Sequence, residues 1–234
     1  MDYAKIYPGD ELAKFDGAKN LEQGHLKYGD ALAAICYAHG ISYDDITYQW
    51  PQVKNNERFV GGDVQSQMDF VRTKATRTPQ NILEIGAGRG EVSLFLTNMG
   101  YSVTALDPGA DFNELLQQSN IKLFPESSQM PSHIINKPLH LADIDYSQYD
   151  TILMVESLEH ILAEHFDPQY QLIKQNFKGR LCITNWLVYH PIAIGQYAHR
   201  DLHCRLVDDA LYNQYCADGE KVYRNRSHLC VDYK

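Results

Sequence analysis

The sequence predicts an α/β protein with a doubly wound, mostly parallel sheet and a mainly helical N-terminal cap. From residue 81 to residue 184, short apolar runs alternate with segments whose apolar residues recur at helical spacing, which is the order of β-α-β units. The first 78 residues lack this alternation. We therefore expect residues 1–78 to form the cap and residues 79–234 to form a ligand-binding domain.

The cap is expected to hold two helices and an irregular segment between them. The first helix should cover residues 30–39, and the second should begin after Asp63, which can cap it. Residues 44–58 are rich in aromatic side chains and contain Pro51, so a lid over a cleft and a packed arm are both open interpretations. The inward positions expected on the second helix are Val64, Met68 and Val71.

Residues 81–96 are typical of a buried strand, a glycine turn and a helix start. Gly86, Gly88 and Gly90 form the pattern G-x-G-x-G. Glycines let the chain turn sharply and let a ligand lie against bare backbone, beside the free N–H groups of the next helix. A dinucleotide loop would have its third glycine at position 91, where Glu91 stands and would repel a diphosphate. The pattern therefore favours a zwitterionic amino-acid cofactor, with a turn that binds nothing as the alternative.

Two acids follow the next predicted strands. Asp107 ends a strand at residues 101–107, where a carboxylate can accept hydrogen bonds from both ribose hydroxyls of an adenosine-bearing cofactor. Asp143 and Ile144 end a short strand expected at residues 139–144. There the carboxylate can accept from the adenine amine while Ile144 packs on the ring. A turn-forming Asp107 and a solvated Asp143 are the alternatives.

The remaining predicted elements continue the alternation and complete the sheet. They are a helix beginning at Asp111, strands at residues 151–155 and 180–184, a helix from Asp167 that stops at Gly179, a helix at residues 208–216, and terminal strands around Val222 and at residues 229–233.

Glu156, Glu159 and His160 directly follow the predicted strand at residues 151–155, at the edge where open α/β sheets bind ligands. If a helical turn starts there, the three side chains share one face and can hold a divalent cation. A solvated helix start with a surface histidine is the alternative. Without a metal, His160 is the natural general base, because an imidazole pKa of about 6.5 suits proton removal at physiological pH.

Taken together, the motifs at residues 81–184 resemble those of the class I S-adenosylmethionine (SAM)-dependent methyltransferases, which have a Rossmann-like fold. The string E-S-L-E-H at residues 156–160 resembles the E-x-x-E-H variant of a metal-binding O-methyltransferase subgroup. The resemblance implies that residues 79–234 form a SAM-binding methyltransferase domain with His160 and Glu159 as catalytic residues. It implies a divalent metal (Mn, Co, Fe, Zn or Mg) on Glu156, Glu159, His160 and a later histidine, for which His203 matches better than His190 or His199. The SAM-binding residues that it implies are Glu84, Gly86, Ala87, Gly88, Asp107, Pro108, Asp143 and Ile144.

The function that this resemblance implies is O-methylation of a hydroxyl on a small molecule, with the metal lowering the pKa of that hydroxyl. Two alternatives stay open: metal-dependent 2′-O-methylation of an RNA 3′ end, and SAM binding without catalysis. A nicotinamide oxidoreductase is disfavoured, because the third glycine and a Tyr-x-x-x-Lys pair are missing.

The composition of the chain limits the classes of substrate and partner that we expect. Lys and Arg number 21 against 30 Asp and Glu, which gives a net charge of −9 and disfavours nucleic acid as a substrate. The five cysteines show no C-x-x-C spacing, which fits reduced thiols. The start of the chain lacks a signal-peptide pattern, and no apolar run is long enough to span a bilayer. We expect a cytoplasmic protein with a small-molecule substrate and no membrane partner, of open oligomeric state.

Overall fold

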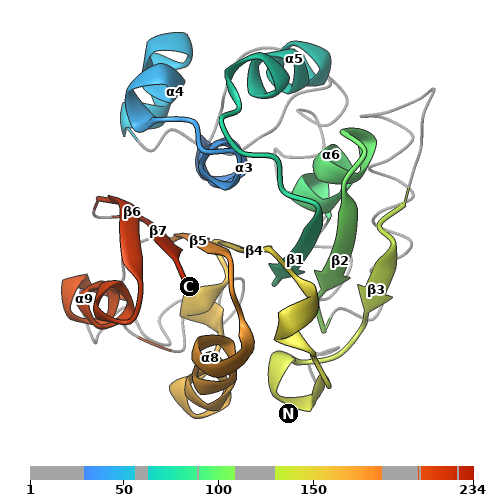
Figure 1. Cartoon of the computed structure of the whole chain (residues 1–234), viewed down its shortest axis with the longest axis vertical. Coiled ribbons are helices and arrows are strands. Elements are labelled where there is room, and N and C mark those ends of the chain that lie inside the picture. The colour runs from blue at the N-terminus through green and yellow to red at the C-terminus, as the bar shows by residue number, and fades with distance from the viewer. Residues whose placement is uncertain are drawn as a thin grey trace, which may run out of the picture.

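The computed structural model of the protein describes residues 29–55, 63–88, 90–108, 130–185, 205, 207–225 and 227–234. Within these ranges, seven strands form one mixed sheet in the order β3-β2-β1-β4-β5-β7-β6 (Figure 1). This confirms the predicted Rossmann-like fold class. The strands are β1 Asn81–Ile85, β2 Ser102–Leu106, β3 His133–Ile135, β4 Thr151–Val155, β5 Arg180–Thr184, β6 Glu220–Arg224 and β7 His228–Asp232.

The strand order reverses between β1 and β4. The chain first builds outward from β1 through the parallel strands β2 and β3, and then crosses to β4 and β5 on the other side of β1. In doubly wound sheets, ligands bind at this reversal, outside the carboxyl ends of the strands. β7 pairs antiparallel with both β5 and β6 and completes the sheet.

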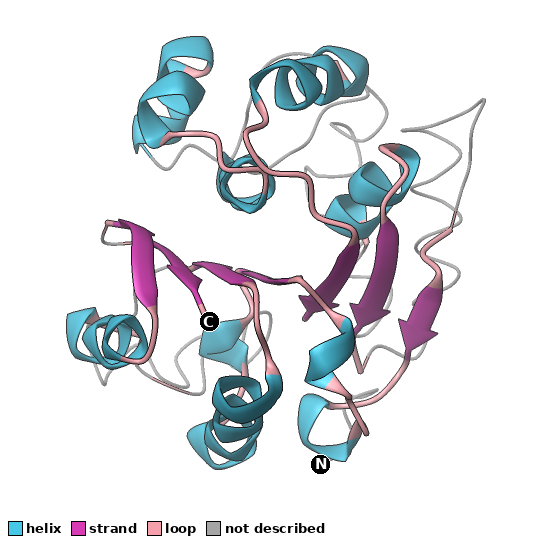
Figure 2. Cartoon of the chain, in the orientation of Figure 1, coloured by secondary structure: helices cyan, strands magenta, loops and turns pink. Residues whose placement is uncertain are grey.

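Helices cover both faces of the sheet (Figures 1 and 2). One face carries α3 Gly29–Ala38, α4 Tyr43–Gln49, α5 Val64–Lys74 and α6 Glu91–Asn98, and the other carries α8 Ala163–Asn176 and α9 Asp209–Ala217. Four short 3-10 helices are η2 Pro51–Asn55, η3 Leu139–Leu141, η4 Tyr146–Gln148 and η5 Leu158–His160.

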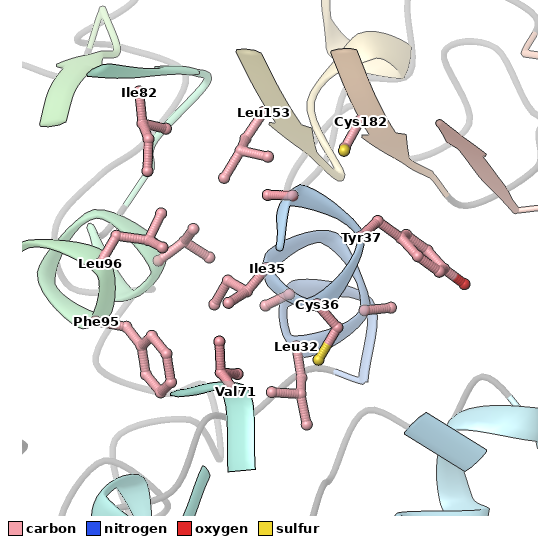
Figure 3. Close-up of a cluster of buried hydrophobic side chains, with 14 of the residues drawn as sticks. Leu32, Ile35, Cys36, Tyr37, Val71, Ile82, Phe95, Leu96, Leu153 and Cys182 are labelled. Carbon is pink, nitrogen blue, oxygen red and sulfur yellow. The ribbon is translucent and has the colours of Figure 1, made fainter. Parts of the chain in front are cut away.

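Two apolar cores follow from this layering. Ile82, Leu153 and Cys182 point from the sheet toward Ile35 of α3 and Phe95 of α6 (Figure 3). Their neighbours along the strands point to the other face, toward α8 and α9. Because both faces of the central strands are covered, their sequences read as continuous apolar runs instead of alternating ones.

The helix α3 lies directly on the sheet. All its residues are buried, which suits a segment that is apolar on nearly every side. Asp30, at the start of α3, contacts His228, which lies next to the carboxyl end of β5. At the other end of α3, the carbonyl of Ala38 accepts from Arg77, which also donates to Thr151 at the amino end of β4. α3 therefore runs antiparallel to the parallel strands.

The rest of the described cap is also helical. The prediction of an irregular segment at residues 44–58 is wrong where the structure describes it, because α4 and η2 occupy residues 43–55 and bury Ile46, Trp50 and Val53. Burial of these side chains favours the packed arm over the lid. The second predicted helix is confirmed as α5, and Asp63 caps it by accepting from the Ser66 N–H at 2.6 Å. The domain boundary at residue 78 remains a prediction.

One predicted strand beyond the cap is wrong, and one predicted helix begins at a different residue. Residues 139–141 form η3 after Pro138 instead of a strand, and the third strand is β3, whose residue His133 pairs with Thr104. The helix expected from Asp167 begins at Ala163 instead and contains Pro168. Pro168 is the sixth residue of α8, so the helix continues through a residue that costs it one N–H donor and usually marks a boundary. The helix expected from Asp111 lies outside the described residues.

None of the helices in the described ranges is long and apolar enough to cross a membrane. Cys36, Cys182, Cys216 and Cys230 carry free thiols. The sulfurs of Cys182 and Cys230 lie 3.4 Å apart across the β5–β7 pair.

Candidate active site

The glycine loop leaves β1 through two glycines with different surroundings. Gly86 has a φ of 77°, and a Cβ added there would lie 2.3 Å from the Cβ of Ser157. Gly88 has a φ of 51°, is exposed, and would meet nothing within 4 Å. Gly86 is therefore a packing position against the exit of β4. Gly88 presents bare backbone to open space, which is the arrangement that a bound ligand needs.

Asp107 lies beside this loop. Its Oδ2 accepts from the N–H of Gly88 at 2.9 Å. The loop is further tied to the end of β2, because the N–H groups of Gly86 and Ala87 both donate to the carbonyl of Leu106, at 2.8 and 3.0 Å. The structure thus brings together four of the predicted cofactor-binding residues at the carboxyl edge of the sheet. Pro108, directly after Asp107, is half-buried at the same edge.

Glu84 sits below the loop, inside the sheet. It is 2% exposed and accepts a hydrogen bond from the hydroxyl of Ser93 on α6. Burial raises the pKa of this carboxyl to about 8, and the negative charges of Glu91 and Asp107 act in the same direction, against the Ser93 hydrogen bond. The charges of Glu91 and Asp107 thus act close to the glycine loop, which suits a ligand that carries positive charge.

The exit of β4 turns sharply against the loop. Glu156 adopts a φ of 47°, in the left-handed region that non-glycine residues rarely occupy, and its N–H donates to the carbonyl of Thr184 at 2.7 Å. The hydroxyl of Ser157 donates to the carbonyl of Ile85 at 2.9 Å. Such strained backbone persists where its surroundings fix it, and it clusters at functional sites.

The helical turn considered for residues 156–160 forms only in part. The 3-10 helix η5 begins only at Leu158, and the left-handed Glu156 lies outside it, so the i, i+3, i+4 face does not form. Glu159 is buried and His160 is partly exposed, with His160 Nε2 at 3.9 Å from Glu159 Oε1. In the part of the chain that the structure describes, no three His, Cys, Asp or Glu side chains are placed to hold a metal ion. His203 lies outside that part, so the four-ligand set stays a prediction.

Asp143 and Ile144 follow η3, beyond the carboxyl end of β3. Asp143 is exposed, whereas Ile144 is partly buried against the core on the α8 side. Their role toward adenine stays a prediction. Close to them, the rings of His140 and His165 stack at 3.7 Å and tie η3 to α8.

One polar cluster at the same edge was missed from the sequence. His228 is fully buried, and its Nε2 lies 2.7 Å from Asp30 Oδ1 while its Nδ1 lies 3.1 Å from the hydroxyl of Tyr37. His228 pairs with Thr184 across β5 and β7, which places the cluster beside the exit of β5. Asp30 and His228 are 198 residues apart, so no local motif could have joined them.

Asn185, directly after β5, was also missed as a candidate site residue. Its side chain is fully buried at the carboxyl edge.

Comparisons with known proteins identify a family and support the fold. A family model described as "Methyltransferase domain" matches residues 57–208, more than half of the chain. No curated protein matches the chain significantly. Among solved structures, magnesium protoporphyrin IX methyltransferase from Synechocystis PCC 6803, with bound SAH, is similar at 14% identity and a TM-score of 0.50, over 73% of this chain and 81% of its own. A second is 1,6-didemethyltoxoflavin-N1-methyltransferase from Burkholderia thailandensis, at 15% identity and a TM-score of 0.49, over 100% and 90% of the two chains. With its glycine loop and seven-stranded sheet, the chain belongs to the methyltransferase-domain family and is a SAM-dependent methyltransferase.

Proposed function

We propose that this enzyme transfers the methyl group of SAM to a hydroxyl on a small molecule held at the carboxyl edge of β4 and β5. The observation that carries the proposal is the open backbone at Gly88, tied to Asp107 at 2.9 Å and flanked by the polar exit of β4. A cofactor at Gly88 and an acceptor at the β4 exit would be neighbours, as a direct transfer requires. The net charge of −9 supports a small acceptor over RNA.

The residues present fit SAM. The backbone of Gly86, Ala87 and Gly88 would hold the amino-acid end, and Asp107 would accept from the ribose hydroxyls. Asp143 and Ile144 would contact adenine, next to Pro108. Glu91 and Asp107, the acidic neighbours of Glu84, would favour the cationic groups of the cofactor. When bound, SAM supplies an electrophilic methyl group on a positively charged sulfur.

In this proposal, His160 takes the proton from the acceptor hydroxyl. Its imidazole is partly exposed at the exit of β4, and the carboxylate of Glu159 lies 3.9 Å away, where it would stabilise the imidazolium that forms. Methyl transfer needs no covalent enzyme intermediate, so the remaining task of the protein is to hold acceptor and methyl group in line.

A metal-assisted form of the reaction uses the same residues differently. The E-S-L-E-H sequence supports it, and it requires Glu156, Glu159, His160 and His203 to converge on one ion. RNA 3′-end methylation depends on this form. The described residues offer no three-ligand group, so we favour the metal-independent route.

Cofactor binding is tested first, by titrating SAM and its product into the protein in a calorimeter. Asp107→Ala should weaken binding about 10- to 100-fold through the loss of charge-assisted hydrogen bonds. Unchanged affinity in Asp107→Ala would overturn the assigned cofactor contacts, and a wild type that binds neither compound would overturn the proposed function.

The proton acceptor is tested by turnover on a panel of phenols and catechols, read as product formation from SAM. His160→Gln should lower kcat by about 10²- to 10⁴-fold with SAM affinity unchanged. His165→Gln is the matched control, because His165 also lies 3.9 Å from a glutamate and is equally exposed. Equal activity in the two variants would refute the role of His160. Activity lost to a chelator, with metal found by elemental analysis, would favour the metal-assisted form. Cofactor binding without turnover on any acceptor would favour the non-catalytic alternative.

A further inference from the structure

Asn185 carries a buried amide whose hydrogen-bonding capacity is unused. The backbone N–H of Asn185 donates to the carbonyl of Ser227 at 2.8 Å, but within the described structure neither the oxygen nor the nitrogen of its side-chain amide has a hydrogen-bond partner. The residue is 0% exposed. Burying an amide in this way is costly, and more than nine in ten buried polar groups in native proteins are satisfied. A partner for this amide is therefore missing.

The position of Asn185 indicates what that partner is. Alternation along β5 puts its side chain on the face of Leu181 and Ile183, which is the face that α8 and α9 cover. The carbonyl of Ser227 accepts both from Asn185 and from the hydroxyl of Tyr212 at 3.3 Å, so α9 lies next to Asn185. The N–H of Glu156 donates to the carbonyl of Thr184, the residue before Asn185, so the exit of β4 lies close by as well.

A buried amide without partners is not by itself a site. Gln67 on α5 is also fully buried, and within the described residues both of its amide atoms lack partners, yet α5 follows no strand exit. Asn185 differs because it stands at the carboxyl end of β5, directly beside the exit of β4. The Glu156 N–H joins the two exits through the carbonyl of Thr184. In open α/β sheets this edge binds the ligands.

We propose that Asn185 binds the methyl acceptor and selects a small molecule with a lactam edge. A carboxamide places one acceptor and one donor side by side in a plane, and a lactam N–H and C=O match them as a pair. An acceptor without that pair would leave the Asn185 amide buried and unsatisfied, which disfavours it strongly. This inference rests on the proposed function for the place of the acceptor, but the amide itself can be tested separately.

The first test is thermal unfolding of three variants in which a buried amide becomes leucine. Asn185→Leu should keep or raise the Tm, by roughly 2 to 6 °C, because it removes unsatisfied polar atoms at nearly constant shape. Gln67→Leu should behave in the same way. Asn225→Leu should lower the Tm, because its amide accepts from the N–H groups of Ser227 and His228 and donates to Tyr223. A loss of Tm in Asn185→Leu as large as that in Asn225→Leu would mean that Asn185 is structural, and would overturn the proposal.

The second test is calorimetric binding of 4-hydroxy-2-quinolone and its N-methyl derivative, which lacks the lactam N–H. Wild type and Gln67→Leu should prefer the lactam by about 10- to 100-fold, and Asn185→Leu should lose that preference. No preference in the wild type, including no binding of either compound at millimolar concentration, would overturn the proposal. Both measurements are made without cofactor. Absence of SAM binding would therefore refute the proposed function alone. Absence of a preference for the lactam would refute only this inference.

Discussion

Replacing Glu84 with glutamine should change how the stability of the protein depends on pH. In the folded protein, burial raises the pKa of this carboxyl from 4.5 to about 8. Folding therefore disfavours the charged form. Between pH 4.5 and pH 8 the folded state holds a proton that the unfolded state releases, so the free energy of unfolding falls as pH rises, by about 1.4 kcal/mol per pH unit.

Over that window the loss from Glu84 sums to at most about 5 kcal/mol, which is a large part of the stability of an ordinary domain. It is absent below pH 4.5, where both states are protonated, and complete above pH 8. Glutamine keeps the shape and the hydrogen bond to Ser93 but cannot ionise. Glu84→Gln should therefore match the wild type near pH 5 and be the more stable protein at pH 8.

The measurement is urea unfolding of wild type and Glu84→Gln at several values between pH 5 and pH 8. The control is Glu164→Gln, which removes a carboxylate whose side chain is 77% exposed. The stability difference between Glu84→Gln and wild type should grow with pH, whereas that of the control should stay flat. Parallel curves for all three proteins would refute the raised pKa.

Two further predictions concern packing at the site. Gly86→Ala should destabilise the protein by several kcal/mol, because the added Cβ would overlap the side chain of Ser157. Gly88→Ala should cost only about 1 kcal/mol of backbone strain, but it should weaken SAM binding. Urea unfolding measures the first effect, and SAM calorimetry measures the second. His228→Ala should cost about 1 to 3 kcal/mol, since it removes the buried hydrogen bonds that the imidazole makes with Asp30 and Tyr37, and an unfolding midpoint equal to that of the wild type would contradict that role.

Local pattern was enough to predict most of the sheet. The continuous apolar runs of β4 and β5 are a direct result of burial on both faces, and the glycine pattern marks a turn that few other residues allow. β3 was misplaced because a three-residue strand has almost no period, and its place is set by pairing with β2. The start of α8 was misplaced because Pro168 is a boundary signal that the helix overrides.

The candidate site was predictable where its residues are neighbours in sequence. Gly86, Gly88 and Asp107 follow strands, so topology brings them together. The geometry of Glu156 was not predictable, because its left-handed backbone depends on contacts with the next strand. Neither Asn185 nor His228 carries a local motif. Their burial and their hydrogen-bonding environment mark them as candidate site residues, and both depend on the assembled fold.

The burial of α3 on every side has a consequence for how the protein is made. Its ten residues are an apolar segment with no polar stripe to face water, and they contact β4 and β5, which the ribosome adds much later. Until then, the apolar surface of this helix is exposed on the nascent chain, because the strands that bury it have not been made. Exposed apolar segments of this kind aggregate or recruit chaperones. Production of the protein should therefore respond to slower synthesis at low temperature and to chaperone supply.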